Sequence, residues 1–170
     1  DITAFVQRLS IIVFGVFYVS LLMSYLILIR KLENGANLIF LLLFIIWAGD
    51  SAAYYIGTKW GKHKLYPKIS PKKSVEGSIA GLIGSVIAVF LAKWWFLDSI
   101  SSMDCLILGL SIGILGQLGD LSESMIKRSC GVKDSGKIIP GHGGVLDRLD
   151  SLLFSAPLLY YYMKILLNCG

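Results

Sequence analysis

The stretch Ser124–Asp150 reads SMIKRSCGVKDSGKIIPGHGGVLDRLD and is polar, although strongly apolar segments lie on both sides of it. Long apolar segments cross membranes as helices, so the other segments are expected to form a scaffold around this connection. The stretch combines carboxylates, cations and a turn at His142–Gly144 in which glycines leave the backbone accessible. This mixture predicts a site that holds a polyanion through a divalent cation.

The composition of the whole chain indicates an integral membrane protein. Of its 170 residues, 55% are hydrophobic and 16% are charged, and the mean hydropathy is +0.72. This is too apolar for a soluble domain. Five windows are long enough to span a bilayer as helices: 10–29, 37–56, 78–97, 105–122 and 150–168. No strand-like alternation competes with them, so we predict an all-α, polytopic transmembrane helical bundle of about five helices with polar cytoplasmic loops.

Basic residues predict the orientation of the helices. Lys and Arg gather at Arg8, in the loop 57–75 and in the loop 123–149, which the windows place on one side of the membrane. Because cytoplasmic loops are rich in Lys and Arg, this side is predicted to be cytoplasmic, with the N-terminus inside and the C-terminus outside. The net charge of +5 then fits anionic lipid headgroups and a nucleotide polyphosphate, and we find no nucleic-acid motif.

Four aspartates are candidate ligands of a hard metal ion. Asp147 and Asp150 are three residues apart and would share one face of a helix. Asp120 lies at the end of the fourth window and Asp50 at the end of the second, where an ionisable group is costly and usually functional or paired. We predict Asp120 and Asp147 as the core of a Mg²⁺ site, with Asp50 and Asp150 as further ligands or supporting partners. A second, monovalent cation and a purely structural role for Asp50 are left open.

Cations and small polar residues near these carboxylates are candidate phosphate ligands. The set comprises Lys72, Lys73, Ser74, Ser124, Lys127, Arg128, Lys133, Lys137, His142, Gly143, Gly144 and Arg148. Glycine amides and helix starts can both approach an anion closely. Ser74 is also expected to cap the third helix, with Glu76 in its first turn. Lys72 and Lys73 could instead act only as topology signals, and His142 could only shape its turn.

Three parts of the sequence resemble one enzyme family. The first lies in the polar stretch, at Ser124, Lys127, Arg128, Lys133, Asp134, Gly136, Ile139, Pro140, His142, Gly143, Gly144, Asp147, Arg148 and Asp150. This pattern is similar to the signature of the phosphatidate cytidylyltransferases, also called CDP-diacylglycerol synthases. The segments GDSAAYYIG (49–57) and ISPKKSVEGS (69–78) resemble two further blocks of that family, with Ser74 where threonine is more common.

The resemblance implies a reaction and a set of roles. The reaction is the transfer of a cytidylyl group from CTP to phosphatidic acid, which gives CDP-diacylglycerol and pyrophosphate in phospholipid biosynthesis. It implies dependence on Mg²⁺ and a site that faces the cytoplasm at a bacterial inner membrane. The catalytic roles fall on Asp120, Asp147, Lys127, Arg128 and Arg148. Residues 1–170 would form a single transmembrane catalytic domain without the further N-terminal membrane helices that members of this family carry. A homodimer is left open.

Other classes of protein share some of these features. Intramembrane carboxylates and a glycine-rich connection also occur in transporters and channels, but no inverted repeat is detectable here. A catalytically idle membrane scaffold is another alternative. Among enzymes, the nearest alternative is a lipid kinase that uses CTP, which would yield phosphorylated lipid and CDP. The cysteines Cys105, Cys130 and Cys169 form neither a zinc-ligand pattern nor a disulfide framework.

Cysteine labelling tests the predicted topology. After the native cysteines are replaced by serine or alanine, Lys62→Cys and Lys133→Cys should react with an impermeant thiol reagent from the cytoplasmic side. Ser101→Cys should react only from the opposite side, because an odd number of helices separates it from the other two positions. Labelling of positions 62 and 133 from opposite sides would show that the predicted helix count is wrong.

Overall fold

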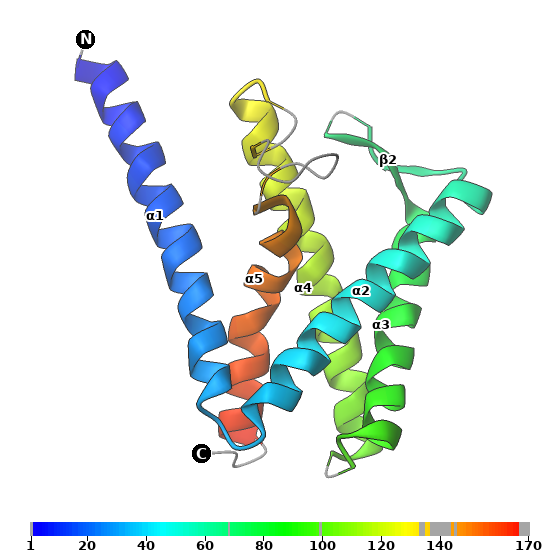
Figure 1. Ribbon diagram of the computed structural model, residues 1–170. Coiled ribbons are helices and arrows are strands. Elements are labelled where there is room, and N and C mark those ends of the chain that lie inside the picture. Colours follow the sequence, from blue (N-terminus) through cyan, green and yellow to red (C-terminus); the bar gives the residue numbers. More distant parts are fainter. Residues whose placement is uncertain are drawn as a thin grey trace.

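The computed structural model describes residues 2–67, 69–98, 100–132, 135–136, 144 and 146–166. Most of these residues are helical. The helices are α1 (Ile2–Arg30), α2 (Gly35–Trp60), α3 (Val75–Trp95), α4 (Ser102–Ser129) and α5 (Leu146–Tyr161), and a π-helical turn, η1 (Tyr162–Leu166), follows α5. They run up and down in one bundle (Figure 1). The predicted fold class, a helical membrane bundle, is confirmed.

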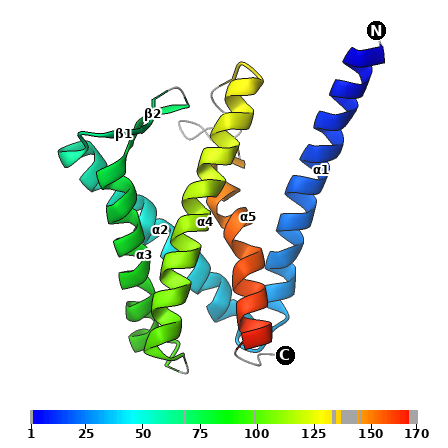
Figure 2. The same ribbon diagram turned by 180° about the vertical axis from the view of Figure 1, so that it is seen from behind.

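The order of the helices agrees with the predicted topology. Within the described residues, α1 to α4 are long and apolar enough to cross a membrane. The N-terminus, the end of α2, the end of α4 and the start of α5 lie at one end of the bundle (Figures 1 and 2). The turns after α1 and after α3 lie at the other end. The assignment of the first end to the cytoplasm stays a prediction.

Local signals in the sequence determine where helices begin. Ser74 caps α3 by accepting a hydrogen bond from the Gly77 amide at 3.2 Å, as predicted. Ser101 and Asp104 form a reciprocal capping box at the start of α4. Before α2, Asn34 has a φ of 54°, a left-handed conformation that asparagine adopts more readily than most residues. Each of these helices therefore starts at a residue whose chemistry suits the position.

Small residues allow α2, α3 and α4 to pack closely. A Cβ atom added at Gly84 of α3 would lie 2.7 Å from the Cβ of Ala52 in α2. One added at Gly109 of α4 would lie 2.6 Å from the Cα of Val86 in α3. Helices that approach this closely gain the van der Waals contacts that drive association in a bilayer. Larger side chains cannot be accommodated at these crossings without a shift of the helices.

The helix α5 differs from the fifth predicted window, 150–168. Its α-helical part covers Leu146–Tyr161, contains Pro157 and passes into η1. Its 16 residues correspond to about 24 Å, which is shorter than the hydrocarbon core of a bilayer. It is not among the described helices that meet the length and composition of a membrane span. Instead it packs against α4 and α1 and buries Leu153 and Ala156.

A β-hairpin occurs where no strand was predicted. β1 (Lys64–Tyr66) and β2 (Ser70–Ser74) pair antiparallel and connect α2 to α3 (Figure 2). The segment is short and polar and has no alternating pattern, so its hydrophobic periodicity could not reveal it. Its geometry depends on the two helix ends that it joins, and the Val75 amide donates to the His63 carbonyl at 2.9 Å where they meet.

Substitution of Gly109 tests the packing of α3 against α4. Gly109→Ala should destabilise the folded chain by about 1 to 3 kcal/mol, because the added methyl group would overlap the Val86 backbone. The matched control is Gly15→Ala in α1, where no atom lies within 4 Å of the added Cβ. Thermal unfolding in detergent measures both variants. Equal melting temperatures would contradict the close approach of the two helices.

Candidate active site

A cavity of about 540 Å³ lies between α2, α3, α4 and the hairpin. Its lining includes Asp50 of α2, three consecutive residues of β2 and Asp120 of α4; those of β2 are Lys72, Lys73 and Ser74. All five were predicted from the sequence as metal or phosphate ligands, and they come from three separate segments. The structure brings these segments together, and we take the cavity as the candidate active site.

Charges of opposite sign meet in this cavity. The Lys73 Nζ lies 2.5 Å from the Asp120 Oδ2, and the two side chains are 28% and 36% exposed. Asp50 is close enough to both groups to interact electrostatically with them. Lys73 therefore offsets the repulsion between the two carboxylates while all three groups remain accessible from the cavity.

A polar pair inside the cavity was missed by the sequence reasoning. Gln117 of α4 donates through Nε2 to the Ser78 carbonyl of α3 at 2.9 Å, and its Oε1 accepts from the Ser78 hydroxyl. Both residues line the cavity. Hydrogen bonds between helices hold membrane bundles together where lipid offers no other partner. A glutamine inside an apolar window was a signal in the sequence, but it did not show where the partner lies.

The rest of the cavity wall is mostly apolar. It includes Leu82 of α3 together with Ile114 and Leu118 of α4. Ile114 and Leu118 are 47% and 46% exposed, so apolar surface is also accessible along α4. An anionic group could be held at the charged residues while a hydrocarbon chain contacts this wall. The cavity thus suits an amphiphile that carries a phosphate.

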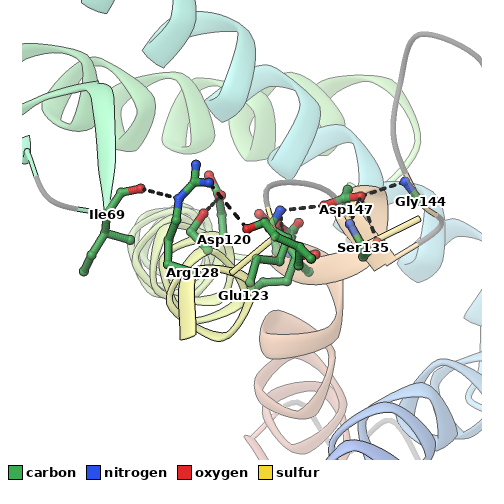
Figure 3. Close-up of polar contacts among 12 residues, drawn as sticks. Ile69, Asp120, Glu123, Arg128, Ser135, Gly144 and Asp147 are labelled. Atoms are coloured by element: carbon green, nitrogen blue, oxygen red, sulfur yellow. Dashed lines mark hydrogen bonds and ion pairs between the residues drawn. The ribbon is translucent and has the colours of Figure 1, made fainter. Parts of the chain in front are cut away.

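A second polar cluster lies further along α4, where this helix meets α5 (Figure 3). The Lys127 Nζ lies 2.6 Å from the Glu123 Oε2 and 2.5 Å from the Asp147 Oδ1. The side chains of Glu123, Asp147 and Lys127 are 1%, 10% and 16% exposed. Because a buried carboxylate is costly without a cation, Lys127 is needed to neutralise these partners. Glu123 was not among the predicted site residues.

Asp147 anchors the chain that precedes α5. Its Oδ2 accepts hydrogen bonds from the Ser135 amide at 2.9 Å, the Ser135 hydroxyl at 2.8 Å and the Gly144 amide at 2.7 Å (Figure 3). Burial raises the pKa of this carboxyl, but Lys127 and these donors outweigh the burial and hold the pKa well below its ordinary value. Asp147 is therefore an ionised carboxylate whose two oxygens already have donors.

The two aspartates predicted as the metal core lie in different places: Asp120 in the cavity and Asp147 in the second polar cluster. Asp120 lies in the cavity and pairs with Lys73, whereas Asp147 pairs with Lys127 and does not line the cavity. The sequence placed both aspartates near the same end of the bundle, which is where they lie. It could not show which cation each would contact. A metal bound by both residues stays a prediction, and the structure instead places Asp50 beside Asp120.

Asp150 interacts with residues of both the cavity and the second polar cluster. Its side chain is buried, and its Oδ1 accepts from the Ser151 amide at 2.6 Å. It interacts electrostatically with Asp120, Asp50 and Lys127, although it does not line the cavity. This position fits the predicted supporting role better than that of a ligand to a substrate-bound ion.

Arg128 links α4 to the hairpin turn. Its Nε donates to the Ile69 carbonyl at 3.4 Å (Figure 3). Its Nη1 donates to the Val132 carbonyl at 3.4 Å. The Ser124 hydroxyl donates to the Asp120 Oδ1 at 3.5 Å. Ser124 thus contacts a residue of the cavity lining, whereas Arg128 contacts the hairpin turn. The roles of both residues toward a phosphate stay predictions.

Several predicted phosphate ligands lie outside the described residues. They are Lys133, Lys137, His142 and Gly143, and the side chain of Arg148 is not described either. Gly144 is described, and its amide donates to Asp147. The part of these residues in the site stays a prediction.

The fold and the site together define a membrane-embedded helical protein with a cavity at one end, in which a lysine of the hairpin pairs with a carboxylate of α4. Its family is clear from comparison with known proteins, because the Cytidylyltransferase family matches residues 2–166. The chain belongs to this family. The resemblance found in the sequence is thereby confirmed.

Several relatives carry names that state an activity. The phosphatidate cytidylyltransferase of Bacillus subtilis is 44% identical over 163 residues, covering 94% of this chain and 60% of the relative. That of Synechocystis is 46% identical over 122 residues, covering 72% and 41%. A relative from Escherichia coli, uncharacterized protein YnbB, is 40% identical over 137 residues, covering 79% and 45%. The chain spans about half the length of the curated relatives it matches.

A double substitution tests the ion pairs of Lys127. Lys127→Met should lower the free energy of unfolding by about 3 to 5 kcal/mol, because the Glu123 carboxylate would remain buried without its cation. Adding Glu123→Gln should recover part of this loss, since the uncompensated charge is then removed. The unfolding transition in denaturant, followed in detergent, measures both.

Arg128→Met is the matched control for this experiment. The side chain is exposed and its described hydrogen bonds go to backbone carbonyls, so the loss should stay below about 1 kcal/mol. If Lys127→Met unfolds at the same denaturant concentration as the parent chain, Lys127 does not hold these carboxylates.

Proposed function

We propose that this chain is the catalytic part of an enzyme that transfers a cytidylyl group from CTP to phosphatidic acid. The products are CDP-diacylglycerol and pyrophosphate. The observation that carries the proposal is the cavity in which Asp50, Lys73 and Asp120 meet beside an apolar wall. The names of two relatives support the same reaction.

The two substrates make different demands on the site. CTP is soluble and highly charged, whereas phosphatidic acid keeps its acyl chains in the bilayer. A cavity with charged residues at the end of the bundle, and with Leu82 and Leu118 in its wall, offers surface for both kinds of group. A fully polar pocket or a fully apolar one would exclude one of the two substrates.

Mg²⁺ is the metal in this proposal, with Asp50 and Asp120 as the residues that would hold it. Both line the cavity with carboxylate oxygens, the ligands that Mg²⁺ prefers. Within the described ranges, no group of three or more His, Cys, Asp or Glu side chains is placed to hold an ion. Mg²⁺ usually keeps several waters and takes one or two carboxylates plus substrate phosphates, so this donor set fits. When bound, the ion would offset negative charge on the phosphate oxygens.

The residues of the chain act mainly by positioning the substrates. The attacking lipid phosphate is already ionised, so the reaction needs no strong general base. The main obstacle is the repulsion between anionic groups, and Lys72 and Lys73 line the cavity where they can reduce it. Contact with Asp120 holds the Lys73 ammonium in place before a substrate arrives.

The proposed site faces the cytoplasm at the inner membrane of a bacterium. The hairpin end of the bundle exposes Lys59, Lys62 and Lys64 in addition to the lysines of the cavity. Cytoplasmic loops favour Lys and Arg, and a basic surface there attracts both anionic lipid and nucleotide.

Substitution of the cavity aspartates tests this function. Asp50→Asn and Asp120→Asn should each lower the rate by about 10²-fold or more, because each removes a charge that would hold the metal while it preserves side-chain size. The assay measures pyrophosphate and CDP-lipid formed from CTP and phosphatidic acid, with and without Mg²⁺. Melting temperatures are recorded alongside to show that the variants are folded.

Asp98→Asn is the matched control, because Asp98 is exposed at the opposite end of the bundle and should leave the rate unchanged. Activity near that of the parent chain in either cavity variant, at saturating and at limiting Mg²⁺, would rule out the metal assignment. Formation of phosphorylated lipid and CDP would identify a CTP-using lipid kinase instead.

A further inference from the structure

A carboxylate outside the cavity contacts the base of the hairpin that carries the cavity lysines. Glu76 is the second residue of α3, and its side chain is 29% exposed. Its carboxylate accepts hydrogen bonds from the Lys62 amide at 3.2 Å and from the His63 amide at 3.3 Å. Its Oε1 also lies 2.6 Å from the His63 Nδ1. Glu76 does not line the cavity.

We propose that Glu76 is a positioning residue that fixes the hairpin over the cavity. Lys62 and His63 lie between the end of α2 and the start of β1, and the hydrogen bonds described for their amides go to Glu76. One side chain at the start of α3 thus joins the point where the chain enters the hairpin to the point where it leaves. The Val75 amide, which donates to the His63 carbonyl at 2.9 Å, closes the same base through the backbone.

The contacts of β2 connect the base of the hairpin, which Glu76 holds, to the cavity. Ser74, at the end of β2, is 3% exposed. A Cβ atom added at Gly61 would lie 2.8 Å from the Ser74 Cβ, so the chain that follows α2 packs closely against Ser74. The preceding residue of β2, Lys73, contacts Asp120 of α4. A shift of the hairpin base would therefore move Lys73 relative to Asp120. Arg128 adds a separate contact at the hairpin turn, where its Nε donates to the Ile69 carbonyl at 3.4 Å.

Hydrogen exchange tests the positioning role without any need for activity. In the chain reconstituted in lipid nanodiscs, Glu76→Ala should speed amide exchange across residues 62–74 by about tenfold or more, because the amides of Lys62 and His63 lose their acceptor. Glu76→Gln keeps one acceptor oxygen and should give a smaller increase. His63→Ala keeps both backbone hydrogen bonds and should also give a smaller increase than Glu76→Ala. Glu33→Gln, in the exposed turn after α1, is the control and should change nothing.

Kinetics test whether Glu76 acts through Lys73, and this part rests on the proposed function. Glu76→Ala should lower kcat/KM for CTP by about tenfold to a hundredfold, mainly through a higher KM, because the phosphate-binding lysine is no longer held in place. A merely structural defect would reduce the active fraction and hence kcat, and it would leave KM unchanged. In a chain that already carries Lys73→Met, Glu76→Ala should raise KM for CTP by less than about twofold. Both residues are proposed to act through the contact between Lys73 and Asp120.

The outcomes separate this inference from the proposed function. Unchanged exchange across residues 62–74 in Glu76→Ala overturns the inference. An unchanged KM, or effects of Glu76→Ala and Lys73→Met that multiply in full, also overturns it. If the parent chain forms no CDP-lipid, the proposed function fails, and the exchange data alone decide whether Glu76 positions the hairpin.

Discussion

Ionised side chains inside a membrane bundle must be neutralised, and this requirement organises the charged residues of the chain. Asp120, Glu123 and Lys127 follow one another at spacings of three and four residues, so α4 presents them on one face. Asp120 receives a lysine from the hairpin, and Glu123 shares its lysine with Asp147 of α5. The same face of α4 therefore holds both the hairpin and the start of α5 in place.

Space for these groups depends on how the helices are packed elsewhere. Glycines at the crossings, among them Gly84 and Gly109, let α2, α3 and α4 approach closely in the middle of the bundle. Toward the hairpin end, α3 and α4 diverge (Figure 1). Residues of both helices line the cavity. The helices therefore pack closely at their glycines and separate toward the hairpin end. The hydrogen bonds between Gln117 and Ser78 still join α3 to α4 beside this opening.

Much of the fold was predictable because hydropathy is a local property. Long apolar windows revealed α1 to α4, and Asp50 and Asp120 stood out because ionisable residues are rare in such windows. The hairpin was missed, since it follows from the placement of two helix ends and not from any periodicity of its own. The predicted fifth window starts at residue 150, whereas α5 starts at Leu146, for a related reason. Its polar first turn is stabilised by contacts with α4 and the preceding chain, which hydropathy does not record.

Five residues of the candidate site were predictable from the sequence, but the Gln117–Ser78 pair and the pairing of the charged residues were not. Asp50, Lys72, Lys73, Ser74 and Asp120 were all identified from residue type and local context, and all line one cavity. Which lysine meets which carboxylate depends on contacts between distant segments, and a single sequence does not encode these in any local pattern. Asp120 and Asp147 are the clearest example. The sequence placed them near the same membrane depth, which suggested one shared metal ion, but Asp120 contacts Lys73 and Asp147 contacts Lys127.

The number of opposing charges distinguishes Lys73 of the cavity from Lys127 of the second polar cluster. Lys127 contacts two carboxylates, and one of them, Glu123, is 1% exposed. Removal of the Lys127 charge would therefore leave a buried negative charge. Lys73 contacts one carboxylate, and both partners remain about a third exposed toward the cavity. An incoming phosphate can therefore share the Lys73 ammonium without stranding a buried carboxylate, whereas it would have to compete with two partners for Lys127. The first arrangement suits a residue that receives a ligand, and the second suits one that holds α5 against α4.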